Sequence, residues 1–182
     1  MSEQKSILLC LKKDLEVITN DGNWKAKFKV CLLSHSFHMT LLIRMGSYSR
    51  KIPIVGSVLS FIFEYLIRVI YASDISCKAE FGEGLNIMHG HDIVIGSGAK
   101  VGKNNKIFNG VTLGNKNTES TKIEQPDLGN NVVLSTGVKV LGKVKIGDNS
   151  IVGANSVVTK DIPGNSIWAG VPAREIRKVT CD

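Results

Sequence analysis

The stretch DLGNNVVLSTGVKVLGKVKIGDNSIVGANSVV, residues 127–158, carries an apolar residue at every sixth position. These positions are Leu128, Leu134, Val140, Ile146, Val152 and Val158. Glycine follows several of them, as in Ile146-Gly147, where a turn between short strands needs a small residue or a positive φ. Each hexad therefore predicts one flat side of a coil, with its apolar residue pointing into a shared core.

The same period runs upstream of this stretch. It gives Ile75, Phe81, Ile87 and Ile93, and after a slip of two residues it gives Ile95, Val101, Ile107 and Leu113. Three hexads close one triangular coil, and a single coil cannot bury its own apolar face, so stability comes from stacking coil on coil. We therefore predict a mainly β fold, a left-handed parallel β-helix.

Two interruptions mark the limits of this repeat. Residues 115–127, NKNTESTKIEQPD, are polar, lack the hexad pattern and predict a loop extruded from the stack. The repeat stops at Asp161-Ile162-Pro163-Gly164, because proline and glycine end it. The predicted β-helix domain is thus 73–165, followed by a C-terminal tail at 166–182.

Residues 1–72 show helical signals instead, with apolar residues spaced by three and four and a break near Pro53. Two or three helices are expected before a helix from Pro53 to about Tyr71. That last segment is apolar but carries Glu64 and Arg68 in the same half, which is costly at a bilayer centre. It predicts an amphipathic helix packed on its neighbours, with contact to a membrane surface as the alternative.

Composition excludes several classes of protein. The four cysteines among 182 residues lack CxxC spacing, so neither a disulfide framework nor a zinc knuckle is indicated. The first residues lack the apolar core of a secretory signal, so we expect a cytoplasmic protein, with the inner face of the membrane as the alternative. A net charge of +7 is spread without aromatic interleaving, which favours phosphorylated small ligands over nucleic acid.

Three stretches carry a more specific resemblance: DISCKAEFGEGLNIMHGHDIVIG (74–96), FNGVTLGN (108–115) and VGANSVVTKDIPGNSIWAGVPAR (152–174). In combination they resemble the serine acetyltransferase branch of the hexapeptide-repeat acyltransferases. The resemblance implies an O-acetyltransferase that takes its acetyl group from acetyl-CoA.

The resemblance implies that His89 and Asp74 are the catalytic pair. His89 would be the general base for the acceptor hydroxyl, and Asp74 would fix its tautomer and stabilise the imidazolium. Alternatively, His89 is a corner residue bonded to a carbonyl. His91 matches no catalytic position and is expected to be exposed or to line the cleft. A zinc site would need three histidines where the predicted β-helix offers two, so no metal is expected.

The resemblance also places acetyl-CoA in a groove between adjacent β-helices of a homotrimer. Small residues there let a pantetheine arm approach the backbone, and basic residues suit the nucleotide phosphates. The implied positions are Gly114, Ser135, Thr136, Gly137, Gly153, Ala154, Ser156, Lys160 and Arg174.

Several positions depart from the family pattern. Glu124-Gln125-Pro126 stands where serine acetyltransferases carry an arginine-histidine pair that grips the substrate carboxylate, and Glu124 would repel that group. Met88 stands where the family has an aspartate. Asp21 matches a substrate-binding aspartate, although Asp21-Gly22 also predicts an ordinary turn.

These departures make a sugar hydroxyl, as in capsule and exopolysaccharide O-acetyltransferases, the expected acceptor. The candidate substrate-binding residues are Asp21, Met88, His91, Glu124 and Gln125. A serine O-acetyltransferase of cysteine biosynthesis is one alternative. A β-helix that binds a partner or ligand without turnover is another, and a metal-binding enzyme is a third. Partnership with cysteine synthase is not expected, because the family's terminal isoleucine is absent.

Overall fold

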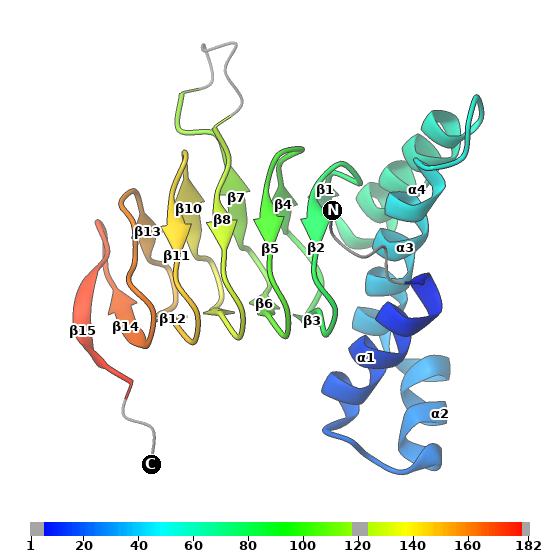
Figure 1. Cartoon of the computed structure of the whole chain (residues 1–182), viewed down its shortest axis with the longest axis horizontal. Coiled ribbons are helices and arrows are strands. Elements are labelled where there is room, and N and C mark those ends of the chain that lie inside the picture. Colours follow the sequence, from blue (N-terminus) through cyan, green and yellow to red (C-terminus); the bar gives the residue numbers. More distant parts are fainter. Residues whose placement is uncertain (1–5, 118–123, 180–182) are drawn as a thin grey trace.

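Four helices stand at one end of a parallel β-helix in this computed structural model, which describes residues 6–117 and 124–179 (Figure 1). The helices are α1 (Ile7–Thr19), α2 (Trp24–Leu33), α3 (His35–Ser49) and α4 (Gly56–Tyr71). They confirm the helical character expected of residues 1–72. Helix α4 begins three residues after Pro53, since residues 51–55 form turns.

Side-chain caps explain where two helices begin. The Asn23 side chain accepts a hydrogen bond from the Ala26 N–H at the start of α2, and Ser34 Oγ accepts one from the Phe37 N–H at the start of α3. Each cap satisfies a backbone donor that the first turn of a helix leaves unpaired.

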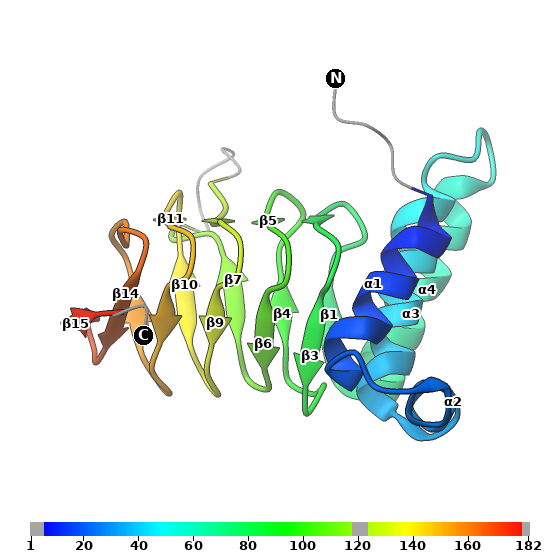
Figure 2. The ribbon, with the colours of Figure 1, turned by 60° about the horizontal axis from the view of Figure 1, so that its bottom comes forward.

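Short strands build the β-helix, and they form three sheets that are parallel except at one end (Figure 2). Sheet A has the order β1-β4-β7-β10-β13, sheet B the order β2-β5-β8-β11 and sheet C the order β3-β6-β9-β12-β14-β15. The strands are β1 (Asp74–Ile75), β2 (Glu80–Phe81), β3 (Asn86–Met88), β4 (Val94–Ile95), β5 (Lys100–Val101), β6 (Lys106–Phe108), β7 (Thr112–Gly114), β8 (Asp127–Leu128), β9 (Val133–Leu134), β10 (Lys139–Leu141), β11 (Lys145–Ile146), β12 (Ile151–Val152), β13 (Val157–Val158), β14 (Ser166–Ala169) and β15 (Arg174–Lys178).

The hexad residues form the core as predicted. All fourteen belong to one apolar cluster, and only Phe81 among them is partly rather than fully buried. A second buried column lies two residues before every hexad position except Ile93, which the exposed His91 precedes by two. This column includes Ala79, Leu85, Ala99, Val111, Val132, Val138 and Val144. Each side of the β-helix thus points two columns of side chains into the core. The period of six in the sequence identified one of these columns.

The register of the strands shows where the coils depart from a standard length. Val133 pairs with Ile151, eighteen residues on, whereas Asp74 pairs with Val94, twenty residues on. The two extra residues lie in the corner between β3 and β4. Thr112 pairs with Lys139, twenty-seven residues on, because the loop predicted at 115–127 leaves the stack there. Residues 118–123 of that loop lie outside the described residues.

The coil extends further than the hexad pattern indicated. Strand β14 pairs in parallel with β12 and so adds to sheet C, although its residues were assigned to the tail at 166–182. Proline and glycine at 163–164 end the apolar period in the sequence. The next strand nevertheless continues the coil, and its first residue, Ser166, is fully buried. Only β15, which pairs antiparallel with β14, leaves the parallel pattern.

A buried ion pair fastens the helices to the first coil. Arg44 on α3 donates from Nε and Nη2 to the two carboxylate oxygens of Asp14 on α1, each at 2.9 Å. The same guanidinium donates to the carbonyl oxygens of Phe81 and Gly82, and Asp14 accepts from the Leu85 N–H at 2.8 Å. Both side chains are almost completely buried, so the charges are stabilised by complete pairing rather than by water.

Helix α4 has two different faces. Ile67 and Tyr71 are buried against the core, and Glu64 accepts a hydrogen bond from the Cys77 N–H at 2.7 Å. The opposite face leaves large apolar side chains exposed, Phe61 at 66 % and Val69 at 63 %. The packing predicted for this helix thus holds for one face only. Among the described residues, no helix is long and apolar enough to cross a membrane.

Candidate active site

His89 lies in the corner where the coil gains its two extra residues. It follows β3 directly and has a φ of 54°, a left-handed conformation that turns the chain toward β4. Its side chain is exposed, as is that of His91. The His91 ring is held by the corner itself, because its Nδ1 lies 3.1 Å from the carbonyl oxygen of His89. The corner thus offers two imidazoles to solvent at one point of the coil.

Asp74 belongs to the same corner one coil earlier. Its backbone N–H donates to the carbonyl oxygen of Ile93, just after the histidine corner, at 2.8 Å. Its carboxylate, however, is bound by Arg68 on α4, with Nη2 2.7 Å from Oδ1, and this hydrogen bond raises the pKa of the Arg68 guanidinium. Within residues 6–117 and 124–179, no hydrogen bond joins Asp74 to His89, so the direct pairing that the resemblance implied is not formed here.

Most residues predicted to bind the cofactor lie along the same edge of the β-helix. Backbone hydrogen bonds stack the successive corners there, from Gly110 N–H to the His91 carbonyl, from Gly137 N–H to the Asn109 carbonyl, and from Asn155 N–H to the Thr136 carbonyl. The edge therefore carries the predicted residues Ser135, Thr136, Gly137, Gly153 and Ala154 in line with the histidine corner. Arg174 pairs with Ala169 at the far end of this edge.

Three predicted cofactor residues have other surroundings. Gly114 ends β7 and Lys160 follows β13, so both lie at the other border of sheet A. Ser156 is fully buried, and its hydroxyl donates to the Gly153 carbonyl at 2.6 Å and accepts from the Gly170 N–H at 3.0 Å. This hydroxyl closes the last coil and faces away from a ligand on the surface, which corrects its predicted role.

Sequence reasoning did not single out Lys139 and Arg68. Lys139 Nζ lies 2.6 Å from the Gly110 carbonyl and 3.1 Å from Thr112 Oγ1, which fixes a cation on sheet A beside the stacked edge. Lys139 is one residue before the hexad residue Val140, and neighbouring residues on a strand point to opposite faces, so its side chain is predicted to point outward. The sequence could therefore have identified Lys139 as a surface cation. Arg68 had been noted only as a charge that disfavours a membrane span.

The predicted substrate residues are scattered. Met88 is the last residue of β3 and precedes His89. Asp21 lies in a turn with Asn20, and both residues have a positive φ. The Asp21 N–H donates a hydrogen bond to the Glu16 carbonyl. The ordinary turn that Asp21-Gly22 predicted is thus present. Glu124 is exposed, and its N–H donates to Asn115 Oδ1 at 2.8 Å. Gln125 packs over Gly96 at the border of sheets A and B, away from the histidine corner.

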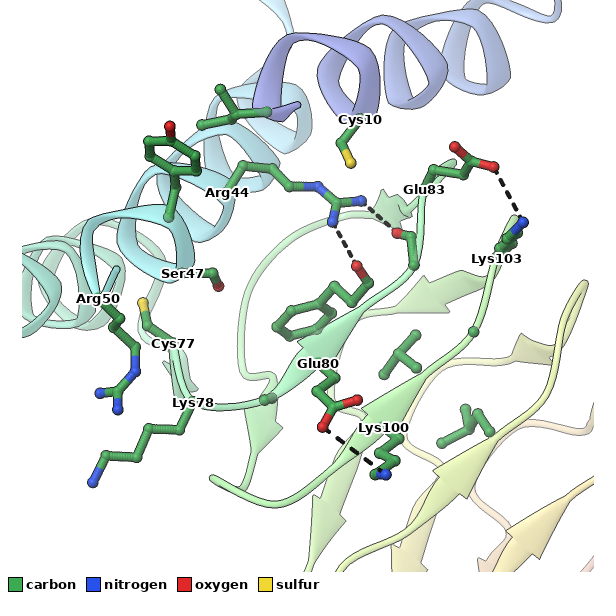
Figure 3. Close-up of a pocket in the computed structure, with 18 of the residues that line it drawn as sticks. Cys10, Arg44, Ser47, Arg50, Cys77, Lys78, Glu80, Glu83, Lys100 and Lys103 are labelled. Carbon is green, nitrogen blue, oxygen red and sulfur yellow. Dashed lines mark hydrogen bonds and ion pairs between the residues drawn. The ribbon is translucent and has the colours of Figure 1, made fainter. Parts of the chain in front are cut away.

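A cavity of about 980 Å³ lies elsewhere, between α1, α3 and sheet B (Figure 3). Several of its charged groups serve structural contacts: Arg44 binds backbone carbonyls, Lys103 lies 3.4 Å from Glu83, and Lys100 lies 3.9 Å from Glu80. No histidine lines this cavity among the described residues. We therefore place the candidate active site at the histidine corner, where the groups suited to acid–base chemistry lie.

A separate question is whether the site suits a metal. In the described part of the chain, no group of three or more histidine, cysteine, aspartate or glutamate side chains lies close enough to bind one ion.

Stacked hexads with a histidine at one corner and small residues along the same edge define an acyltransferase of the hexapeptide-repeat class. In agreement, the family model described as bacterial transferase hexapeptide (six repeats) matches residues 126–160. A serine acetyltransferase from Helicobacter pylori strain J99 is 36 % identical over 174 residues, which span 94 % of this chain and 99 % of that protein. The chain therefore belongs to the serine acetyltransferase family, and the predicted enzyme class, an O-acetyltransferase, is confirmed.

Other relatives agree with this assignment. A serine acetyltransferase from Synechococcus elongatus is 40 % identical over 129 residues, 71 % of this chain but 51 % of that longer protein. The Neisseria gonorrhoeae serine acetyltransferase superposes with a TM-score of 0.86 at 28 % identity, covering 97 % of this chain and 67 % of that one.

A Brucella abortus serine acetyltransferase solved in complex with coenzyme A superposes with a TM-score of 0.82 at 30 % identity over 95 % of this chain and 68 % of that one. These relatives are serine acetyltransferases rather than capsule or exopolysaccharide enzymes. The finer resemblance that the sequence suggested is therefore not supported.

Proposed function

We propose that this protein transfers the acetyl group of acetyl-CoA to the side-chain hydroxyl of L-serine. The observation that carries the proposal is the 36 % identity to the Helicobacter enzyme over 99 % of its length, which includes the histidine corner. The donor is acetyl-CoA, the co-substrate expected from the sequence, and the Brucella relative binds coenzyme A on the same fold. Serine was the alternative acceptor at the sequence level, and these relatives favour it over a sugar.

The geometry suits a general-base mechanism at His89. An exposed imidazole at the corner takes the proton of the serine hydroxyl while its oxygen attacks the carbonyl carbon of the thioester. A carbon–oxygen bond forms and the carbonyl becomes a tetrahedral oxyanion, which then collapses as the carbon–sulfur bond breaks. The imidazolium returns its proton to the thiolate of coenzyme A, so the products are O-acetyl-L-serine and free coenzyme A.

The surroundings of the corner support this order of events. Stacked backbone turns at 135–137 and 153–155 run from the corner along one edge, where glycine and other small residues let an extended pantetheine arm approach the backbone. Lys139 lies on sheet A beside this path, and Arg174 lies at its far end. Asp74, whose carboxylate is held by Arg68, supplies negative charge at the start of β1, one coil before the histidine corner.

A saccharide hydroxyl remains the second candidate acceptor, and one observation favours it. Glu124 is exposed at the base of the loop, with its backbone tied to Asn115, so a carboxylate stands where the family pattern has a cation. A substrate carboxylate that approached this side chain would be repelled, whereas a neutral sugar would not.

The release of coenzyme A thiol by the purified protein tests the proposal. Acetyl-CoA is offered with L-serine, with L-alanine as the matched control that lacks the hydroxyl, and with nucleotide sugars in parallel. Saturable release with L-serine and none with L-alanine is the expected result. Release with a sugar alone would overturn the serine assignment and support the second candidate.

Two further expectations from the sequence stay predictions, a homotrimer and a cytoplasmic location. Sedimentation velocity of the purified protein measures the first, and cell fractionation measures the second.

A further inference from the structure

An apolar surface at the helical end of the molecule is left uncovered. On α4, the side chains of Val58, Phe61, Tyr65 and Val69 form one stripe at helical spacing, and each is more than half exposed. The turn before this helix adds Ile54, which is 98 % exposed. An apolar patch of this kind, contiguous rather than scattered, marks a surface that binds another body.

A second stripe lies on α2, a helix in which no residue is buried. Trp24, Phe28 and Leu32 follow one another at spacings of four residues and are 72 %, 63 % and 62 % exposed. Figures 1 and 2 show α2 and α4 at the same end of the molecule, opposite the end that carries β15. The two stripes therefore belong to one end of the protein.

The segment that carries most of these side chains is positively charged. Residues 24–63 contain no aspartate or glutamate but six lysines and arginines, so this segment has a net charge of +6 in a chain of net charge +7. Arg44 is buried against Asp14, Lys25, Lys27 and Lys29 lie on α2 among the residues of its stripe, and Arg50 and Lys51 lie in the turn before α4. Glu64, the first acidic residue after this segment, binds the Cys77 N–H.

We propose that this helical end docks on the surface of an anionic lipid bilayer, with Ile54 and the α2 and α4 stripes in the interface. Apolar and aromatic side chains on a helix edged by lysine and arginine have the chemistry of a surface-bound amphipathic helix. The aromatic side chains Trp24 and Tyr65 suit the headgroup region, and the cations pair with lipid phosphates.

Charge favours the bilayer over a second copy of this chain. A contact of this surface with the same surface of another copy would bring the lysines of α2 toward like charges. Nucleic acid would engage the cations but leave Ile54, Phe61 and Val69 in water. An anionic membrane would bind the apolar side chains in its interface and pair its lipid phosphates with the cations. This inference stands apart from the acceptor, because none of these residues belongs to the histidine corner.

Co-sedimentation of the full chain with lipid vesicles tests the proposal. Vesicles of phosphatidylcholine alone are compared with vesicles that contain equal parts of phosphatidylcholine and phosphatidylglycerol. We expect about tenfold more bound protein on the anionic vesicles at about 0.15 M salt, with a large loss at about 1 M salt because surface charges are screened.

Paired variants locate the surface. The double change Ile54→Asp and Phe61→Asp should abolish binding, since both side chains are exposed and their replacement leaves the fold intact. Ile176→Asp is the matched control, because Ile176 is 63 % exposed on β15 at the opposite end and should bind like the wild type. Lys25, Lys27 and Lys29 changed together to Gln should remove the preference for phosphatidylglycerol.

Two results would overturn the proposal. One is equal binding to both kinds of vesicle, or none. The other is a loss of self-association in the double variant without lipid, seen by sedimentation velocity, which would assign the surface to a second copy instead.

Discussion

The guanidinium of Arg68 on α4 lies 2.7 Å from the carboxylate of Asp74, the residue expected to assist the catalytic base. This contact links the helical region to the histidine corner, because Asp74 begins the first strand of sheet A and Arg68 lies in the last turn of α4. Both side chains are about 60 % exposed, so the pair adds little to stability, and its effect is to fix where the carboxylate stands.

Removal of Arg68 should therefore reduce catalysis while leaving the fold intact. For Arg68→Ala we expect kcat/KM for coenzyme A release to fall about tenfold, because Asp74 loses its fixed position beside the imidazole. In a double-mutant cycle with Asp74→Asn, the arginine change should cost nothing further, since its effect acts through that carboxylate. Arg50→Ala is the control, because this exposed arginine lies in the turn before α4, whereas Arg68 lies in the last turn of that helix. This variant should keep the wild-type kcat/KM. An equal loss with and without Asp74 would show that Arg68 acts in another way.

The two corner histidines give a direct comparison. His89→Asn should lower kcat by about 10²–10⁴-fold, since it removes the general base, while asparagine tolerates the positive φ at this position. The thermal midpoint should stay the same because the side chain is exposed. His91→Asn should reduce kcat by less than about tenfold, as it removes only a ring that contacts the His89 carbonyl. The opposite order of effects would move the base to His91, whose Nδ1 already has a partner.

Sequence alone predicts the β-helix well because the period of six reports burial directly. Every hexad residue lies in the core, and the slip of two between Ile93 and Ile95 marks the corner that carries His89 and His91. The second inward column was missed because several of its members are polar. Asn105, Ser150 and Ser156 are fully buried there and bonded to backbone groups, so a hydrophobic period does not detect them.

The contacts of the site were harder to predict because they join distant segments. The resemblance paired Asp74 with His89, but Arg68 binds the carboxylate from a helix whose orientation the repeat does not determine. Arg44 and Asp14 lie thirty residues apart, and neither position differs in the sequence from an ordinary surface charge. The exposure of one apolar face of α4 was likewise not predicted. An amphipathic pattern shows which residues are apolar, but it does not show what packs against them.

The close packing of α3 against α4 and against the turn after β1 makes Gly46 sensitive to substitution. A Cβ at this position would overlap the Sγ of the buried Cys77 and press on Phe63, so Gly46→Ala should lower the free energy of unfolding by about 1–3 kcal/mol despite the better helix propensity of alanine. Gly114→Ala is the control, because its Cβ would meet Thr112 at an ordinary 3.5 Å. Chemical denaturation of both variants measures the difference, and equal stability would mean that Cys77 gives way.

The clamp that joins the helices to the β-helix, made by the buried ion pair of Arg44 and Asp14, should be the polar contact whose loss lowers stability most. Asp14→Ala leaves the Arg44 charge buried without its carboxylate and the Leu85 N–H without its acceptor, so we expect a loss of about 3–5 kcal/mol in the free energy of unfolding. Glu16→Ala, on the same helix, removes only the partly buried partner of the exposed Lys13 and should change stability by less than about 1 kcal/mol. If denaturation showed the two variants to be alike, the clamp would contribute nothing measurable.

Burial of the Cys77 thiol predicts how stability responds to alkaline pH. Desolvation raises the pKa of this thiol to about 11 from an ordinary value of 9.0, so the folded state favours the protonated form. The stabilisation is fully present below pH 9 and is lost as the pH rises toward 11, at most about 2–3 kcal/mol. Cys77→Ala removes this titration, although Tyr71, whose pKa burial also raises, still contributes at high pH. Urea denaturation of both proteins between pH 8 and pH 11 should therefore show a steeper fall for the wild type, and parallel curves would mean that the thiol ionises as readily in the folded protein as in the unfolded one.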